Sequence, residues 1–283
     1  MYRLNDSYNR LVKHATNIRK KILRTAHAKK QGHVGGSLSA ADILTVLYFE
    51  QLHLIEHDVK SQERDRFILS KGHVALGLYC TLAERGFIPE EELLTFDRFG
   101  SRLQAHPDMM RLDYLEMSTG SLGQGISVAV GMALGAKYLK QAFYVFALLG
   151  DGESQEGQVW EAAHIAARYQ LDNLIVIVDY NALQQFGWRE DGIALPPDEQ
   201  LTEKFLSFGF EVFEVDGHNI EQLSKTISAC KNIKNGRPKA IIARTVKGKG
   251  VSFMENNDLW HSKAPNDLEL VLALQELNEG GVI

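Results

Sequence analysis

The chain has 283 residues, of which 45% are hydrophobic, and a formal net charge of −5. This acidic balance argues against a nucleic-acid-binding protein, although the first 30 residues hold nine lysines and arginines against one acid, Asp6. No apolar run approaches the roughly 18 residues of a membrane span, and the polar N-terminus does not resemble a signal peptide. Because Cys80 and Cys230 are the only cysteines, a disulfide framework is excluded and the reducing cytoplasm is the expected location.

Hydrophobic periodicity predicts helices and strands that alternate along the chain. In chain order they are helices at 6–30 and 39–51, a strand at 66–69, helices at 74–85 and 122–140, a strand at 144–149, a helix at 156–170, strands at 174–178 and 211–215, a helix at 220–231 and a strand at 240–244. This alternation is typical of an α/β fold in which helices flank both faces of a parallel sheet. We expect a single domain over residues 1–283, with an exposed loop at 187–200 and a long irregular part beyond Lys247.

The most informative motif follows the predicted strand 144–149. Gly150-Asp151-Gly152 stands there, and Asn181 comes 30 residues after Asp151 (181 − 151), just past the next predicted strand. A right-handed strand–helix–strand crossover brings both polar side chains to the carboxyl edge of neighbouring parallel strands. Carboxylate and amide oxygens beside a helix N-terminus and two glycines suit a hard divalent cation that holds a diphosphate.

Four histidines stand beside glycines or at predicted strand ends: His33, His73, His106 and His261. A single histidine in such a place is more often structural than catalytic. Zinc is a poor alternative, because no His-Glu-x-x-His motif occurs and the close pair His53 and His57 lies near an exposed helix end.

A glycine cluster at 119–125 precedes the helical stretch from Ile126 to Leu139 and could present backbone groups to a flat heterocycle. It is no dinucleotide fingerprint, because no strand pattern leads into it and the glycine spacing is wrong. Further along the same helix, Gly131 and Gly135 are interpreted as sites of close helix packing.

With these residues together, the chain resembles the N-terminal, diphosphate-binding half of a transketolase, and specifically the smaller subunit of a split transketolase. The resemblance covers nearly the whole length and depends on a set of short motifs. They are His33 with Gly35-Gly36-Ser37-Leu38, Ser70-Lys71-Gly72-His73, His106-Pro107, the cluster 119–125, residues 150–160, Asp179-Tyr180-Asn181 with Leu183-Gln184, and His261 with Ala264-Pro265. The Gly-Asp-Gly to Asn spacing specifies thiamine diphosphate, whereas the histidines indicate transketolase.

The resemblance implies a role for each residue around the cofactor. Side-chain oxygens of Asp151 and Asn181 and the backbone carbonyl of Leu183 would bind Mg²⁺. Gly152 would lie against the diphosphate, where a side chain would collide. The remaining cofactor contacts would be His73 and His261 at the diphosphate, Gly120, Ser121 and Leu122 at the thiazolium and aminopyrimidine rings, and Glu156 at the subunit boundary.

The same resemblance implies ketol transfer, in which a two-carbon unit passes from a ketose to an aldose. His33, His106 and His261 would face the donor ketose, which is a sugar or sugar phosphate. The pyrimidine-binding domain is expected on a partner chain, the C-terminal transketolase subunit, so that the isolated chain would be inactive and the assembly a dimer of heterodimers.

Two departures and three alternatives stay open. Ser262 stands where relatives commonly carry glycine, and Phe186 follows Gln184-Gln185 near the expected metal site. A nearer alternative is another thiamine diphosphate enzyme, such as the α-subunit of a 2-oxoacid dehydrogenase or an acyloin-forming synthase. A non-catalytic binding subunit is a more distant one, because a scaffold needs none of these residues together, and a dinucleotide-binding protein comes last.

Overall fold

The computed structural model describes residues 2–55, 58–185, 189–190, 193–194 and 200–279. In these residues five parallel strands form the main sheet in the order β1-β2-β3-β7-β6. The strands are β1 (Arg66–Leu69), β2 (Val145–Gly150), β3 (Leu174–Tyr180), β6 (Glu211–Asp216) and β7 (Lys239–Arg244). All five predicted strands are therefore present, with ends that differ by no more than two residues.

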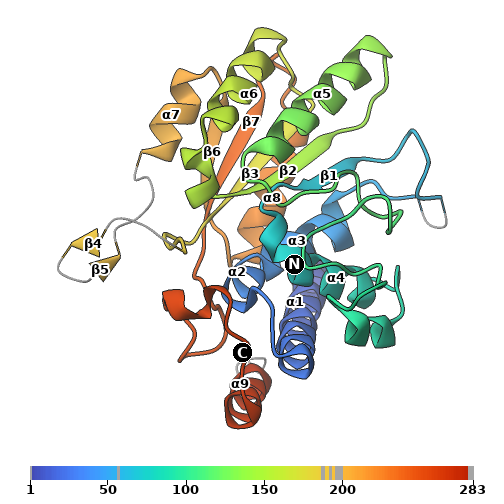
Figure 1. Cartoon of the computed structure of the whole chain (residues 1–283). Helices are drawn as coiled ribbons and strands as arrows, with labels where there is room; N and C mark the ends of the chain where they lie inside the picture. The colour runs from blue at the N-terminus through green and yellow to red at the C-terminus, as the bar shows by residue number, and fades with distance from the viewer. Residues whose placement is uncertain (1, 56–57, 186–188, 191–192, 195–199, 280–283) are drawn as a thin grey trace.

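Helices cover both faces of this sheet, as predicted (Figure 1). One face packs against α5 (Gln124–Tyr138), α6 (Gly157–Arg168) and α7 (Leu201–Ser207). The other packs against α1 (Tyr2–Lys29), α2 (Val34–Ser39), α3 (Ala41–Val46), α4 (Ala75–Glu84) and α8 (Ile220–Asn232), and α9 (Asp267–Glu279) lies against α1.

The strands read as continuous apolar runs because their side chains alternate between two buried layers. In β2, Val145, Ala147 and Leu149 face the α5–α6 side, whereas Phe146 and Leu148 face the α1–α4 side. This alternation fixes the register of the sheet, since a shift by one residue would exchange the two sets.

The predicted helix at 39–51 was wrong in its boundaries. The chain turns helical at Val34, inside the glycine motif, and α2 gives way to α3 around Ala40, after which Leu47–Gln51 forms a π-helical turn. Every residue from Val34 to Ser39 is buried, so that tertiary packing outweighs the poor helix propensity of the two glycines.

The part beyond Lys247 is less irregular than expected, because α9 forms within it. Only Ala273 and Leu277 of this helix are buried, whereas Leu268, Val271 and Leu272 are exposed, and this weak periodicity hid the helix. The short helix α7 was missed for a similar reason, as it buries only Leu201 and Phe205.

The predicted loop at 187–200 lies largely outside the described residues. Its described part holds two short antiparallel strands, β4 (Arg189–Glu190) and β5 (Ile193–Ala194).

Close packing of Gly131 and Gly135 was also a wrong prediction, since a Cβ at either position would meet nothing within 4 Å.

Candidate active site

The carboxyl edge of the sheet gathers polar side chains from neighbouring strands. Asp151 follows β2 directly and Asn181 follows β3, and the two strands are paired with Gly150 opposite Asp179. Asp151 accepts hydrogen bonds from the backbone N–H groups of Gly152 (2.8 Å) and Ala182 (2.6 Å). The carboxylate therefore joins the two strand ends, and Asp151 and Asn181 are both at most 5% exposed.

The side-chain oxygen atoms at this edge are of the kind that bind hard cations. Burial raises the pKa of the Asp151 carboxyl to about 7, and the charge of Asp179 adds to this while Lys71 opposes it. No group of three or more His, Cys, Asp or Glu side chains that could hold a metal exists among the described residues. The carboxylate of Asp151 and the amide of Asn181 are ligand types that suit a magnesium ion, which could take its other ligands from a bound diphosphate and water.

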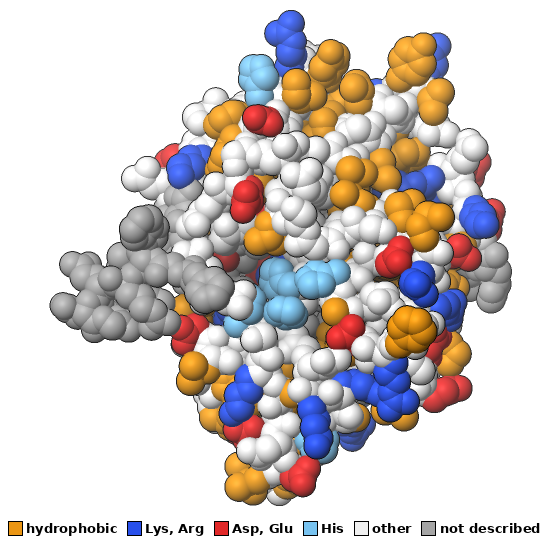
Figure 2. Space-filling view, viewed as in Figure 1, with side chains coloured by type: hydrophobic (Ala, Val, Ile, Leu, Met, Phe, Trp, Pro, Cys, Tyr) orange, Lys and Arg blue, Asp and Glu red, His pale blue; other side chains and the backbone are white. Residues whose placement is uncertain are grey.

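The four predicted histidines lie together on the same cavity, although they come from four separate segments. The ring centroid of His33 lies 5.4 Å from that of His73, 6.1 Å from that of His106 and 5.1 Å from that of His261. Figure 2 shows histidine side chains gathered at the centre of this face. The cavity has a volume of about 510 Å³, and its lining also includes Asp151 and Asn181.

The imidazoles of His33, His73 and His261 are neutral at pH 7. Burial lowers the pKa of His33 to about 4, with the nearby His106 and Lys247 adding to the effect. Burial and Lys247 lower the pKa of His261 to about 3, and burial also places the pKa of His73 well below its usual value. A neutral imidazole can donate one hydrogen bond and accept another, so the cluster suits a substrate with several hydroxyl groups.

Two buried lysines of this cavity were given no role on the basis of the sequence. Lys71 and Lys247 line the cavity and are each 2% exposed. The Lys71 ammonium donates to Asp179 at 2.7 Å, and that carboxylate also accepts from the hydroxyls of Ser39 and Thr245. The positive charge of Lys71 is therefore balanced by the negative charge of the fully buried Asp179.

Lys247 has a different environment. Its Nζ lies 3.0 Å from Nδ1 of His261, and within the described part of the chain no carboxylate forms an ion pair with it. Burial and the charge of Lys71 lower the pKa of Lys247 to about 8, which leaves it mostly cationic at pH 7. A buried cation in such a place suits an anionic ligand. Since both lysines lie just past strand ends, the rule that ligands of α/β sheets bind at the carboxyl edge could have identified them.

Residues 120–122 form another wall of the cavity. Gly120 and Leu122 line it, whereas Ser121 is exposed. Gly120 has φ +158°, and a Cβ there would lie 3.3 Å from the His106 ring. Glycine therefore lets the backbone approach that ring closely.

Glu153 joins this wall to the strand ends. Its Oε1 accepts from the Ser70 hydroxyl (2.5 Å) and Gly123 N–H (2.9 Å), and its Oε2 accepts from Gly150 N–H (3.1 Å). One buried carboxylate thus ties together three segments around the cavity.

The other residues expected at the site have the following positions. Leu183, Gly152 and Glu156 line the cavity, and Glu156 is exposed at its rim. A Cβ at Gly152 would come within 3.2 Å of the Gln184 side chain. Ser262 is exposed and does not line the cavity, and Phe186 lies outside the described residues.

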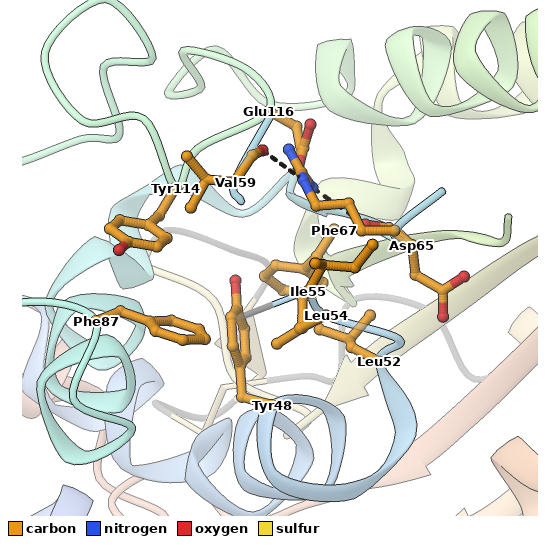
Figure 3. A pocket seen from close by; sticks show the side chains of 11 residues that line it. Tyr48, Leu52, Leu54, Ile55, Val59, Asp65, Phe67, Phe87, Tyr114 and Glu116 are labelled. Carbon is orange, nitrogen blue, oxygen red and sulfur yellow. Dashed lines mark hydrogen bonds and ion pairs between the residues drawn. The ribbon is translucent and has the colours of Figure 1, made fainter. Parts of the chain in front are cut away.

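A second cavity lies elsewhere and has a different chemistry. Its walls are mainly the rings and aliphatic side chains of Tyr48, Phe67, Phe87 and Tyr114 and their neighbours (Figure 3). Its polar end is occupied by the ion pair of Arg64 and Glu116. The lining of this cavity is therefore more apolar than that of the histidine-lined one, and its described lining residues include no histidine.

Comparison with known proteins gives the same picture as the site. Residues 12–277 match the family described as "Transketolase, thiamine diphosphate binding domain". The chain belongs to the transketolase family. It is 44% identical over 276 residues to an apulose-4-phosphate transketolase subunit of Actinobacillus succinogenes, and the match covers 97% of this chain and 98% of the relative.

Two further comparisons define the extent of this transketolase chain. It is 40% identical to the 6-deoxy-6-sulfo-D-fructose transketolase subunit SqwG of a Clostridium species, over 93% of this chain and 94% of the relative. The solved transketolase of Leishmania mexicana superposes with a TM-score of 0.87 and 29% identity, over 95% of this chain and 41% of that one. The expected fold, family, enzyme class and thiamine diphosphate cofactor are thereby confirmed, and transketolase is favoured over the other thiamine diphosphate enzymes.

Among the described helices, none combines the length and the apolar character that a membrane span requires.

Proposed function

We propose that this chain is the cofactor-binding N-terminal subunit of a two-chain transketolase that moves a two-carbon ketol unit from a ketose to an aldose. The observation that carries the proposal is one cavity that holds both the Asp151–Asn181 oxygen pair and the four histidines. Two relatives of similar length are named as subunits of apulose-4-phosphate transketolases, and another is named for 6-deoxy-6-sulfo-D-fructose. A sugar with an anionic terminal group is therefore the proposed substrate class.

In this proposal Asp151 and Asn181 hold Mg²⁺ through side-chain oxygens, and Leu183 does so through its backbone carbonyl. The bent backbone after β3 supports this, because Asn181 Oδ1 already accepts from Leu183 N–H at 3.1 Å and keeps the turn compact. A magnesium ion would also stabilise the buried Asp151 carboxylate, whose charge is costly without a cation.

The diphosphate of the cofactor would lie next to this ion. His73 and His261 would donate hydrogen bonds to it, and Gly152 would leave room for it beside the metal. The Lys247 ammonium, at 3.0 Å from the His261 ring, would supply a matching positive charge. Gly120, Ser121 and Leu122 would lie along the cofactor rings.

Thiamine diphosphate supplies the electron sink for breaking and forming carbon–carbon bonds when it is bound. The residues of this chain would place the substrate and move its protons. His33, His106 and His261 would donate hydrogen bonds to the hydroxyl and carbonyl oxygens of the ketose. A neutral imidazole would also accept the proton of the hydroxyl group next to the bond that breaks, and would return a proton in the reverse step.

The partner would be a C-terminal chain that carries the pyrimidine-binding domain, so that residues 1–283 act as one domain of a larger enzyme in the cytoplasm. An exposed apolar surface supports this assembly. Hydrophobic side chains cover the upper part of the face that displays the histidines, where α5 lies (Figure 2). At the end of α5, Tyr138 and Leu139 are 85% and 64% exposed, and Gly131 is exposed earlier in the helix. Glu156, on the cavity rim, would lie at this boundary in a dimer of heterodimers.

An activity assay with the reconstituted pair tests the proposal. With Mg²⁺ and thiamine diphosphate, the complex should transfer two carbons from a ketose phosphate to an aldose phosphate, and neither chain should do so alone. Release of CO₂ from pyruvate by the complex, without ketol transfer, would instead assign the chain to the 2-oxoacid enzymes.

A further inference from the structure

A chain of buried charges lies behind the loop that carries Lys247. Arg19 of α1 forms two hydrogen bonds with Asp42 of α3, from NH1 to Oδ1 at 3.0 Å and from NH2 to Oδ2 at 2.6 Å. Nδ1 of His218, which follows β6, lies 2.7 Å from the same Oδ2. Arg19 is 7% exposed and Asp42 is 4% exposed. Three segments distant in sequence therefore meet at one carboxylate.

The hydrogen bonds fix the state of His218. The backbone N–H of Val246 donates to Nε2 of His218 at 2.8 Å. A backbone N–H can only donate, so Nε2 holds a lone pair and the ring hydrogen is on Nδ1, where it donates to Asp42. Burial acts to raise the pKa of Asp42, but Arg19 and His218 hold it at about 2, so the acceptor is a carboxylate.

The loop from Val246 to Gly250 is held at two further points, both after Lys247. Nε of Arg19 donates to the Lys249 carbonyl at 3.1 Å, and Gly248 N–H donates to the Gly35 carbonyl at 3.0 Å. Gly248 has φ +82°, and a Cβ there would lie 2.2 Å from the Met254 carbonyl oxygen, so the loop passes very close to its neighbour.

Lys247 is the residue of this loop whose side chain enters the cavity. Its stem packs against Gly35, where a Cβ would lie 3.0 Å from its Cγ, and its ammonium reaches His261. The direction of this long side chain depends on where the backbone at Val246 lies, because a small rotation there is amplified over four methylene groups.

We propose that His218, held by Asp42 and Arg19, is a positioning residue that fixes the backbone at Val246 and thereby directs the Lys247 ammonium toward the diphosphate. The proposal rests on the proposed function for the identity of the ligand, whereas the coupling of His218 to the loop depends only on this chain. Asp42, Arg19 and His218 do not line the cavity and would not contact cofactor or substrate.

Amide hydrogen exchange of the full-length chain, followed by NMR, tests the coupling without any ligand. In His218→Ala the Val246 amide should exchange at least about 10-fold faster, because its acceptor is gone. In His218→Gln most of the protection should remain, since the glutamine oxygen can accept from Val246 and its amide can donate to Asp42. His164→Ala, at an exposed position of α6, is the control. Unchanged exchange at Val246 in His218→Ala would overturn the proposal.

A double-mutant cycle on the complex with its partner subunit tests the consequence for the site. The dissociation constant of thiamine diphosphate is measured at fixed Mg²⁺ for Lys247→Met, His218→Ala and the double variant. Each single variant should weaken binding by about 10-fold or more, the size of one lost charge-assisted hydrogen bond. The double variant should bind no more weakly than Lys247→Met, and His218→Gln should recover most of the affinity.

Additive losses in that cycle would show that His218 does not act through Lys247, and would overturn the proposal. Failure of the unmodified complex to bind thiamine diphosphate would contradict the proposed function instead, while the exchange experiment would still decide the role of His218. If His218→Ala does not fold, Asp42→Asn takes its place in both experiments, since it keeps the shape but removes the charge that orients His218.

Discussion

Asp151 and His33 lie on the same cavity but are proposed to have separable roles. Asp151→Ala removes the one carboxylate of the metal site. Loss of a residue that only orients a metal ligand typically costs about 10–100-fold in affinity, so loss of the ligand itself should cost more than about 100-fold in cofactor binding. Calorimetric titration of the complex with thiamine diphosphate at fixed Mg²⁺ measures this.

His33→Ala should leave cofactor affinity nearly unchanged and lower kcat by about 10²-fold or more, the usual range for a group that transfers protons. The outcome that contradicts this assignment is normal cofactor affinity in Asp151→Ala, or a loss of cofactor binding in His33→Ala that matches the loss of turnover. His53→Ala, at an exposed position away from the cavity, serves as the matched control.

Single residues also show how far a sequence can be interpreted. Asp151, Asn181, His33 and His73 were identifiable because each stands beside glycine or at a strand end, where polar residues need a reason. His106 and His261 were identifiable only through the motifs that resemble transketolase. Lys247 was missed although it follows a strand end, and His218 was missed because nothing local shows that its side chain becomes largely buried. Their roles depend on contacts with residues that are 14 to 176 positions away in the sequence, which hydrophobic periodicity does not reveal.

At the scale of elements, the hydrophobic pattern of α5 is not explained by packing within this chain. The helix is apolar on most sides, yet only one side packs on the sheet, and Gly131 and Gly135 meet no neighbour. We predict that Gly131→Leu weakens association with the partner subunit by about 10-fold or more, because a large side chain is placed on the interface. The same change should stabilise the isolated chain by up to about 1 kcal/mol, since leucine favours a helix more than glycine does.

Thermal unfolding of the isolated chain and the partner dissociation constant measure the two effects. Ala229→Leu adds a similar side chain to an exposed position on α8, on the other side of the sheet, and should leave association unchanged. Equal partner affinity for Gly131→Leu and the unmodified chain would show that α5 is not part of the interface.

Helices and strands were predictable where their buried residues form a regular hydrophobic pattern in the sequence. Strands β2 and β3 are buried at every residue and were found, as was α6 with its one apolar stripe. The break between α2 and α3 was missed because both short helices are buried on all sides, so no stripe marks their ends. The helix α9 was missed for the opposite reason, since it buries too little.

At the scale of the whole molecule, the chain matches relatives that are themselves subunits, and the same fold forms 41% of a longer transketolase. The active site has one open side, where the cavity, Glu156 and the apolar surface of α5 lie on the same face. A second chain that closes this face would complete the cofactor site and would exclude water from it.

Native mass spectrometry of the chain purified from its own cells, with Mg²⁺ and thiamine diphosphate present, tests most directly whether the chain is half of a two-chain enzyme. We expect a complex with a second chain of similar size that retains the mass of the cofactor and the metal, in a two-to-two stoichiometry. A homo-oligomer that binds neither partner nor cofactor would contradict this, and would indicate a non-catalytic protein that keeps the transketolase fold.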